Sequence, residues 1–234
     1  FEYKDPVFSN GAFNFKIIKL DSTGNLISEY ISPLTNGGLS AYSMCIDENN
    51  NITIPAHLNG GPVTIGSIDY HGPLIMMNLS ENFSVNWVYT ASSSTSPGVN
   101  GGLSSGLQIT YSETLSQYIV TGQLNSQLIF GNIIIGSPNT SGTYFIFRVD
   151  YTGNLINASA INYYPQEIIS HQGLVYTAGR TNLNGSSNIQ ILDIVLTCID
   201  NSNQQIWEEI VGSSSYFDYA TDITIDNNDN LYLT

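Results

Sequence analysis

The sequence has few charged residues and very few basic ones. Of its 234 residues, 10% are charged, and 19 acidic residues stand against 5 basic ones, giving a formal net charge of −14. The cations form no cluster in the sequence: Lys4, Lys16, Lys19, Arg148 and Arg180. A chain of this kind is repelled by phosphate groups, so we expect neither nucleic acid nor an anionic membrane as a partner.

Long apolar runs and cysteine are scarce as well. No apolar run approaches the roughly 18 residues of a membrane helix. Residues 1–6 lack the basic and apolar regions of a signal peptide, so we expect that any targeting signal has been removed or lies outside this sequence. Two cysteines are too few for a disulfide framework and lack metal-site spacing. Cys45 and Cys198 fall in different copies of the repeat described below, so we expect free thiols.

What the sequence does contain is an internal repeat with two alternating kinds of segment. The first kind occupies residues 17–27 and again 146–156, where Asp-x-Thr-Gly-Asn follows an apolar strand, and weaker copies lie at 76–87 and 196–207. Both weaker copies contain a Trp eight residues after the residue aligned with Leu20, and these are the only two Trp of the chain. This coincidence supports a common repeat.

The second kind of segment is an alternating strand, an Asp/Asn-rich turn and another strand. Its clearest copy is 223–234, with relatives at 44–55, 109–121 and 168–178. The aligned residues Pro55, Thr121, Ala178 and Thr234 are separated by 66, 57 and 56 residues, which is near the length of a propeller blade. We therefore expect one repeat domain over residues 1–234.

The residue pattern inside each copy is that of β-strands. Apolar residues alternate with polar ones, as in 107–111 and 223–226, so one face of each strand is expected to be buried. The longest stretch without Gly or Pro, 186–211, is rich in Ile and Val and is also predicted to be β. In turns such as Asp21-x-x-Gly24, the Asp side chain can accept backbone hydrogen bonds, and Gly permits a positive φ.

These motifs resemble the bacterial-type β-propeller repeat family called SBBP. Residues 19–25, Trp87, Trp207, 118–122 and the Gly/Ser-rich stretch 212–220 are similar to its unit, although Phe83 and Asn203 replace the turn Gly. The resemblance covers nearly the whole chain. It implies a propeller of four-stranded antiparallel blades on secreted or surface-exposed proteins, without a shared enzymatic activity.

The phase of the repeat places the chain ends inside a blade. The strands before Asp47, Ser112 and Asp226 are expected to be innermost, and the Trp-bearing strands outermost. The sequence then starts before a third strand and ends in a second one. Two arrangements follow: a closed ring of four blades, or four blades of a larger propeller. Closure would remove exposed sheet edges.

Candidate chemical features are few. Asp-rich turns at 47–51 and 226–230 could suggest calcium, but they lack the Gly and distal Glu of an EF-hand loop, and hairpins use the same residues. His57, His71 and His171 occupy unrelated phases of the repeat. We expect no catalytic residue, metal or cofactor. The Trp residues and the 15 Tyr could form a sugar-binding platform, but packing between blades is favoured for both Trp.

The sequence therefore predicts a non-catalytic binding or structural module on a bacterial envelope, a secreted protein or a virus particle. The partner is expected to be a protein or a glycan, with self-assembly left open. The alternative is a carbohydrate-active propeller enzyme, which needs carboxylates converging from inner strands; the expected inner strands contain only Asp222. Variable loops on one face are the predicted binding surface, with these aromatic or histidine contacts: Tyr70, His71, Tyr216, Phe217 and Tyr219.

Overall fold

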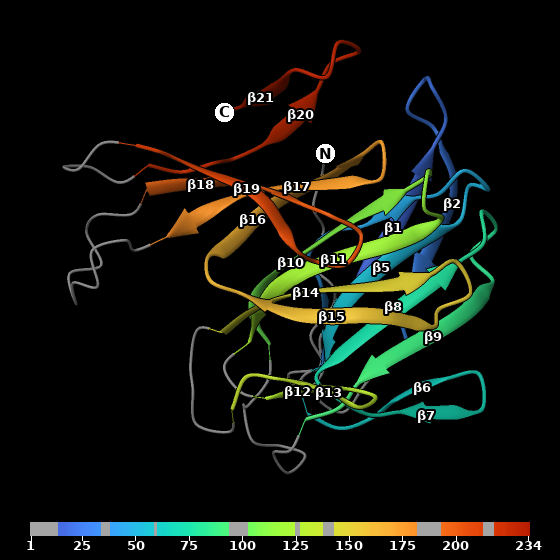
Figure 1. Cartoon of the computed structure of the whole chain (residues 1–234). Helices are drawn as coiled ribbons and strands as arrows, with labels where there is room; N and C mark the ends of the chain where they lie inside the picture. Colours follow the sequence, from blue (N-terminus) through green and yellow to red (C-terminus); the bar gives the residue numbers. More distant parts are fainter. Residues whose placement is uncertain are drawn as a thin grey trace.

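The computed structural model describes residues 14–33, 38–58, 60–93, 103–124, 127–137, 143–181, 193–212 and 218–234. Within these ranges the chain forms β-strands and turns and no helix, so the predicted all-β class is confirmed (Figure 1). The described part of the stretch 186–211 forms two strands, 193–199 and 205–211, joined by a turn, as expected.

Three antiparallel sheets follow one another along the chain, each a meander in sequence order. The first contains β3 (Leu39–Ala41) and β4 (Cys45–Ile46), which both pair with β5 (Ile52–Leu58), followed by β8 (Leu74–Leu79) and β9 (Val85–Ala91). The second contains β10 (Leu103–Ser112), β11 (Gln117–Leu124), β14 (Thr143–Asp150) and β15 (Leu155–Ile161). The third contains β16 (Tyr164–His171), β17 (Leu174–Thr181), β18 (Asp193–Ile199) and β19 (Gln205–Val211).

Two half-units flank these sheets. The N-terminal one pairs β1 (Lys16–Leu20) with β2 (Leu26–Ile31), and the C-terminal one pairs β20 (Ile223–Ile225) with β21 (Leu231–Leu233). The expectation of four four-stranded sheets therefore holds for the second and third sheets, and the first sheet differs only in having two short strands, β3 and β4, beside β5. The half-units are separate two-stranded sheets that lie apart in Figure 1, so closure of a four-bladed ring is not shown.

The connection from the second to the third strand carries an extra hairpin in two sheets. In the first sheet β6 (Val63–Ile65) pairs with β7 (Ile68–Tyr70), and in the second β12 (Leu128–Phe130) pairs with β13 (Ile133–Ile135). Gly66 and Gly131 begin the two-residue turns of these hairpins with φ of 66° and 58°, values that favour glycine. Both hairpins lie at the lower edge of the view in Figure 1.

The short turns of the repeat have the conformation that the sequence predicts. In the turn that begins at Asp150, the carboxylate Oδ1 accepts the backbone N–H groups of Thr152 and Asn154, each at 2.9 Å. The fourth turn residue has a positive φ in every aligned turn, whether or not it is glycine: Gly24 88°, Asn50 61°, Phe83 64°, Gly153 89°, Asn203 63° and Asp229 65°. Phe83 and Asn203 therefore replace glycine without changing the turn.

The core lies between consecutive sheets. β5 and β8 are buried along their whole length, because the first sheet is covered on both faces. One apolar cluster joins the first sheet to the second through Met76, Ile109 and Phe147, and another joins the second to the third through Ile119, Ile146 and Val175. Burial on both faces explains why these strands read as continuous apolar runs instead of alternating.

The cysteines follow the prediction. Cys45 on β4 and Cys198 on β18 are both free thiols, half-buried and buried respectively. Burial raises the pKa of the Cys45 thiol, with a further increase from the nearby Asp47 charge. Both groups are therefore protonated at neutral pH and pack as small apolar side chains.

Candidate binding surface

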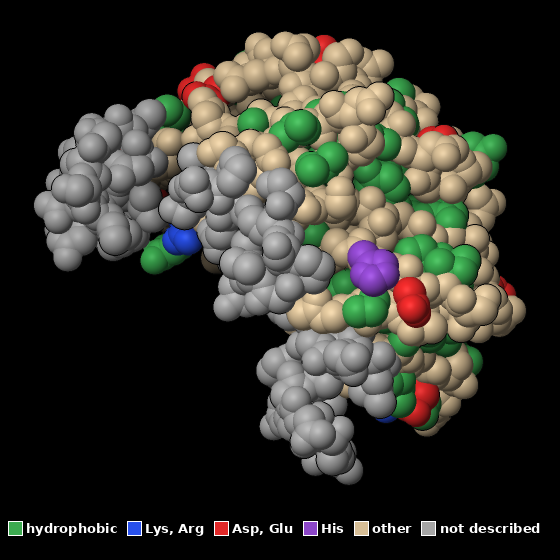
Figure 2. Space-filling view, turned by 90° about the horizontal axis from the view of Figure 1, so that it is seen from below, with side chains coloured by type: hydrophobic (Ala, Val, Ile, Leu, Met, Phe, Trp, Pro, Cys, Tyr) green, Lys and Arg blue, Asp and Glu red, His purple; other side chains and the backbone are tan. Residues whose placement is uncertain are grey.

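The meander places two kinds of connection at opposite ends of the sheets. The short turns lie at one end, which we call the turn face. The connections from second to third strand, and from the last strand of one sheet to the first of the next, lie at the other end, the loop face. Figure 2 views the molecule from below and shows groups of hydrophobic side chains among polar ones, with few charged groups.

The structure places three of the five predicted contact residues. Tyr70 ends β7 and is half-buried against the apolar cluster of Leu39 and Val63, so part of its ring is used in packing. His71 follows it and is exposed. Tyr219, which precedes β20, is 50% exposed. Tyr216 and Phe217 lie outside the described residues. No described contact joins Tyr70 or His71 to Tyr219.

Around Tyr219 the structure brings together a group that sequence reasoning missed. The guanidinium of Arg180, at the end of β17, lies 4.6 Å from the centre of the Tyr164 ring and 5.9 Å from that of Tyr219. The Tyr144 and Tyr164 rings meet edge to face at 5.6 Å. We call these four residues the tyrosine–arginine cluster. They come from β14, β16, β17 and the segment before β20, so the second and third sheets both contribute.

Cation–π geometry defines the electrostatics of this cluster. Burial raises the pKa of Tyr144, and the positive charge of Arg180 opposes that increase. Within the described residues Arg180 forms no ion pair. A half-buried guanidinium that stacks on rings keeps its edge donors available to an incoming carboxylate, hydroxyl or carbonyl group.

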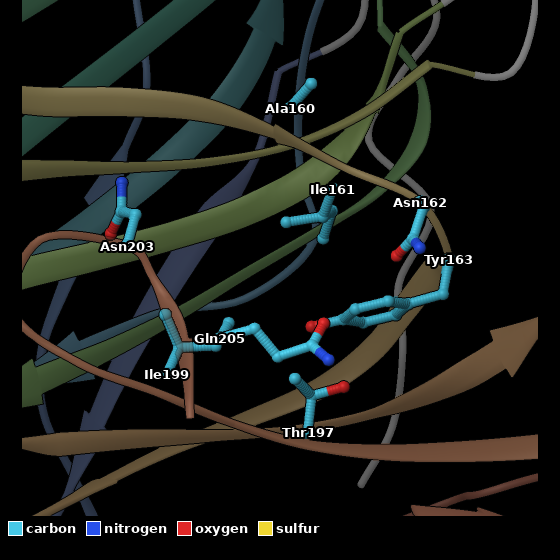
Figure 3. Close-up of a pocket in the computed structure, with 8 residues that line it drawn as sticks. All are labelled: Ala160, Ile161, Asn162, Tyr163, Thr197, Ile199, Asn203 and Gln205. Atoms are coloured by element: carbon cyan, nitrogen blue, oxygen red, sulfur yellow. The ribbon is translucent and has the colours of Figure 1, made fainter. Parts of the chain in front are cut away.

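A pocket of about 340 Å³ lies between the second and third sheets (Figure 3). It is lined by the end of β15, by Asn162 and Tyr163, and by residues of β18, β19 and their connecting turn: Ala160, Ile161, Asn162, Tyr163, Thr197, Ile199, Asn203 and Gln205. The volume is at the small end of the range for ligand sites. The lining combines amides, one hydroxyl and apolar side chains.

Most polar groups in the pocket already have structural partners. Asn203 accepts a hydrogen bond from Arg148 Nε at 2.7 Å and donates to Asn157 Oδ1 at 2.8 Å. The Tyr163 hydroxyl bonds to Thr177 Oγ1. The Thr197 hydroxyl is buried with no hydrogen-bond partner among the described residues. The pocket is therefore mainly a gap between two sheets, with one unused hydroxyl on its wall.

The first strands contain one carboxylate, as the sequence suggested, but it is Glu167 in place of Asp222. β16 begins at Tyr164, earlier than expected, and so includes Glu167; Asp222 lies just before β20. Burial raises the pKa of Glu167, and the negative charge of Asp222 raises it further. The predicted number of acids in these strands therefore holds, but the residue differs because β16 and β20 begin at other positions than expected.

The remaining candidate ligands are dispersed. Burial lowers the pKa of His57, on β5, to about 4. His171 Nε2 lies 2.6 Å from Asp229 Oδ1 and so bridges two turns. Across the described ranges, no three or more His, Cys, Asp and Glu side chains come together as a metal site would require. Nor does any described helix reach the length and apolarity needed to cross a membrane.

The fold is similar to that of a solved structure, but the chain matches no known family. No protein-family model and no curated protein matches the chain. A crystal structure of a Bacteroides caccae protein of unknown function is similar at a TM-score of 0.51 and 11% identity, covering 91% of this chain and 61% of that one. An α-L-arabinofuranosidase of Clostridium thermocellum gives a TM-score of 0.28 at 9% identity, covering 73% and 72%. The chain thus spans about three-fifths of the Bacteroides protein, with which it shares a fold.

Proposed function

We propose that the chain is a non-catalytic binding module of a propeller-type repeat protein, which recognises a protein or a glycan through its loop face. The observation that carries this proposal is the tyrosine–arginine cluster. Tyr and Arg are the residue types most enriched where binding energy concentrates in interfaces. Here three tyrosines and one arginine converge in a chain that has only 5 basic residues.

The arrangement of the sheets supports the propeller part of the proposal. Each complete sheet is a four-stranded meander, or nearly so, and the first strands β10 and β16 lie against each other. Blades of a propeller are packed in this way. The repeat motifs resemble those of SBBP proteins, which are secreted or surface-exposed, and on that resemblance we propose an extracellular or particle-surface location.

The contrast between the two faces supports the binding part. The turn face repeats one hairpin chemistry, whereas the loop face carries connections of different length and content, including β6–β7 and β12–β13. A rigid scaffold with variable loops on one side is a common arrangement for recognition.

The test is binding of the purified chain to a glycan array and to candidate surface proteins, followed by substitution. We expect Arg180→Ala and Tyr219→Ala to weaken binding about tenfold or more, as removal of central interface contacts does. The matched control is Tyr151→Ala, because Tyr151 is 63% exposed on the turn face. Loss of binding in the control variant, with Arg180→Ala unaffected, would contradict the proposal.

A glycosidase is the second candidate, favoured by the Glu167–Asp222 pair. Burial and the negative charge of Asp222 raise the pKa of Glu167, and a carboxyl group with a raised pKa near a second carboxylate is one feature of glycoside hydrolase sites. If this candidate is right, the chain should hydrolyse aryl glycosides or polysaccharides, and Glu167→Gln should abolish the reaction while leaving the unfolding transition in place. Equal rates for the wild type and Glu167→Gln would remove this candidate.

A further inference from the structure

The pocket between the second and third sheets lies where the repeat loses two large side chains. At the first junction Tyr89 stacks on Phe147 of the second sheet, with 6.0 Å between the ring centres. Phe147 lies three residues before the turn of its sheet, and Tyr89 lies nine residues after the first residue of the turn in the first sheet. At the second junction these two positions hold Thr197 and Ser159. The missing ring volume leaves the pocket of about 340 Å³.

The change from apolar to polar extends to the neighbouring strand. In the second sheet Phe147 pairs with Val120, and in the third sheet Thr197 pairs with Thr177. All four residues are buried. Packing alone favours apolar side chains at such positions, because a buried hydroxyl group must find a hydrogen-bond partner or lose stability. The third sheet has therefore exchanged core packing for hydroxyl groups at one place.

One of these hydroxyl groups is available to a ligand. The Tyr163 hydroxyl bonds to Thr177 Oγ1. Burial raises the pKa of Tyr163, and the nearby hydroxyls of Thr177 and Thr197 oppose that increase, yet Thr197 Oγ1 itself has no hydrogen-bond partner in the described structure. Thr197 is 1% exposed and lines the pocket. An unused hydroxyl on the floor of a cavity is costly to keep unless something else bonds to it.

Two amide side chains lie at the mouth of the pocket. Asn162 and Gln205 are exposed, whereas the other polar residues of the lining are buried. Figure 3 shows the amide end of Gln205 directed toward the Tyr163 ring, above Thr197 in this view. Each amide can donate and accept hydrogen bonds. A ligand that reaches the Thr197 hydroxyl therefore passes between two further hydrogen-bonding groups.

The lining favours an uncharged ligand. None of the described residues that line the pocket is charged. Two charged groups act on the lining from outside it, with opposite signs: Arg148 donates to Asn203 Oδ1, and the negative charge of Glu208 adds to the raised pKa of Tyr163. An ionic ligand would lose its hydration without gaining a counter-charge in the lining.

The apolar part of the lining and the volume narrow the ligand further. The Tyr163 ring, Ile161 and Ile199 provide an apolar wall opposite the hydrogen-bonding groups. A sugar ring has the matching surface, with C–H groups on its faces and hydroxyl groups on its rim. At about 30 Å³ per water molecule, the pocket has room for roughly ten waters, which is enough for one sugar ring.

We propose that this pocket binds one ring of an uncharged sugar. Thr197, Asn162 and Gln205 bond to the hydroxyl groups of the sugar, and its C–H face packs on the Tyr163 ring. The proposal does not rest on the loop-face function, because no residue of the tyrosine–arginine cluster lines the pocket. The competing occupant is water, which fills polar cavities of this kind.

The first experiment is saturation-transfer NMR of the purified chain with methyl glycosides of neutral hexoses, 6-deoxyhexoses, pentoses and N-acetylhexosamines, followed by calorimetric titration of those that bind. At least one neutral glycoside should bind, and the methyl glycosides of a uronic acid and of a hexosamine should bind at least fivefold more weakly. Absence of binding by every neutral glycoside would leave water as the occupant and overturn the proposal. Tighter binding of a charged glycoside would overturn it as well.

Substitutions then locate the bound sugar. Thr197→Val keeps the shape of the side chain and should weaken binding about fivefold, as loss of one hydrogen bond does. The matched control is Thr121→Val, because Thr121 is another buried threonine without a hydrogen-bond partner in the described structure and lies outside the pocket lining. Thr197→Phe restores the residue type of the second sheet, fills the pocket and should abolish binding. If Thr197→Phe does not fold, unchanged affinity in Thr197→Val alone overturns the proposal.

A last comparison separates this site from the loop face and identifies the source of the sugar. Arg180→Ala should leave the affinity for the glycoside unchanged. Loss of binding in Arg180→Ala, with Thr197→Val unaffected, would place the sugar at the tyrosine–arginine cluster and overturn the pocket proposal alone. If the source is a glycan chain, an oligosaccharide that ends in the same ring should bind at least as well as the methyl glycoside. If the pocket takes free sugars, only the single ring should bind.

Discussion

The junction between the first and second sheets and the junction between the second and third use the same repeat positions for different chemistry. At the first junction Trp87 lies on Gly153, and Tyr118 donates to Asp47 Oδ2 at 2.6 Å while accepting from Asn78 at 3.0 Å. At the second junction Arg148, Asn157 and Asn203 form the contact between the sheets, and a pocket of about 340 Å³ lies beside them. One junction is aromatic and filled, the other polar and partly open.

The difference shows that a junction tolerates change only in matched sets. Gly153 is required where the opposing residue is Trp87, and an asparagine pair replaces both elsewhere. The aligned residues Asn78 and Arg148 both direct a donor toward the next unit. We expect single substitutions to be costly and their effects to be non-additive across each junction, as is usual for residues in contact.

The largest effect is expected at the polar junction, from Arg148→Ala. Arg148 is fully buried, and its Nε and Nη2 donate to Asn203 and to the Asp200 carbonyl. Removing the side chain leaves both acceptors without a hydrogen bond and opens a cavity, so the free energy of unfolding should fall by about 3 kcal/mol. Arg148→Met keeps most of the volume and should cost less. Urea denaturation measures both; equal stability of Arg148→Ala and the wild type would show that this junction contributes little.

At the aromatic junction, Trp87→Ala should cost about 2 kcal/mol, since the ring is half-buried against Tyr118 and Gly153. The matched control is Trp207→Ala, which alters another half-buried Trp, whose ring contacts Tyr176 of its own sheet in the described structure. Its cost, measured by thermal unfolding of a dilute sample, should be less than half as large. A larger loss from Trp207→Ala would reverse the comparison.

The smallest effect is a pH dependence that separates the junctions. Partial burial acts to raise the pKa of Asp47, but hydrogen bonds from Tyr118 and Asn51 outweigh it and leave the pKa below its ordinary value. The folded state therefore gains stability above that ordinary value, near pH 4, and loses it as the pH falls further. Below pH 4, the protection of backbone amides from hydrogen exchange, relative to their intrinsic exchange rates, should fall first in β5, β10 and β11. Asp47→Asn should remove this difference between the junctions. Simultaneous loss of protection in β16–β19 would contradict this prediction.

The sequence predicted the strands and turns because both depend on local chemistry. Alternation of apolar residues and the Asp-x-x-Gly pattern were enough to locate the turn at Asp150. The position of the two cysteines in different copies of the repeat was enough to predict that both are free thiols. The sequence also predicted that both Trp pack between units, which holds for Trp87, whereas the Trp207 ring contacts Tyr176 of its own sheet. These features follow from one copy of the repeat compared with another, so internal alignment was sufficient.

The tyrosine–arginine cluster could not be predicted in the same way. Arg180 is the cross-strand partner of Tyr164 within the third sheet, but it meets Tyr219 only because the segment before β20 comes to the loop face, a contact with no sequence period. The one available signal was that Arg180 is among 5 basic residues and ends a strand facing the variable loops. Glu167 was missed because strand ends carry weak local signals.

The extra hairpins between second and third strands have a consequence for protein engineering. Leu58 N donates to Pro73 O at 2.9 Å, so the chain is already clamped where the β6–β7 insertion leaves and re-enters the sheet. Because the two ends of the insertion are held together, a longer insertion costs only a little more chain entropy, which grows with the logarithm of its length. This position is therefore suited to grafting foreign peptides, since an insert can be exchanged there without disturbing the register of β5 and β8.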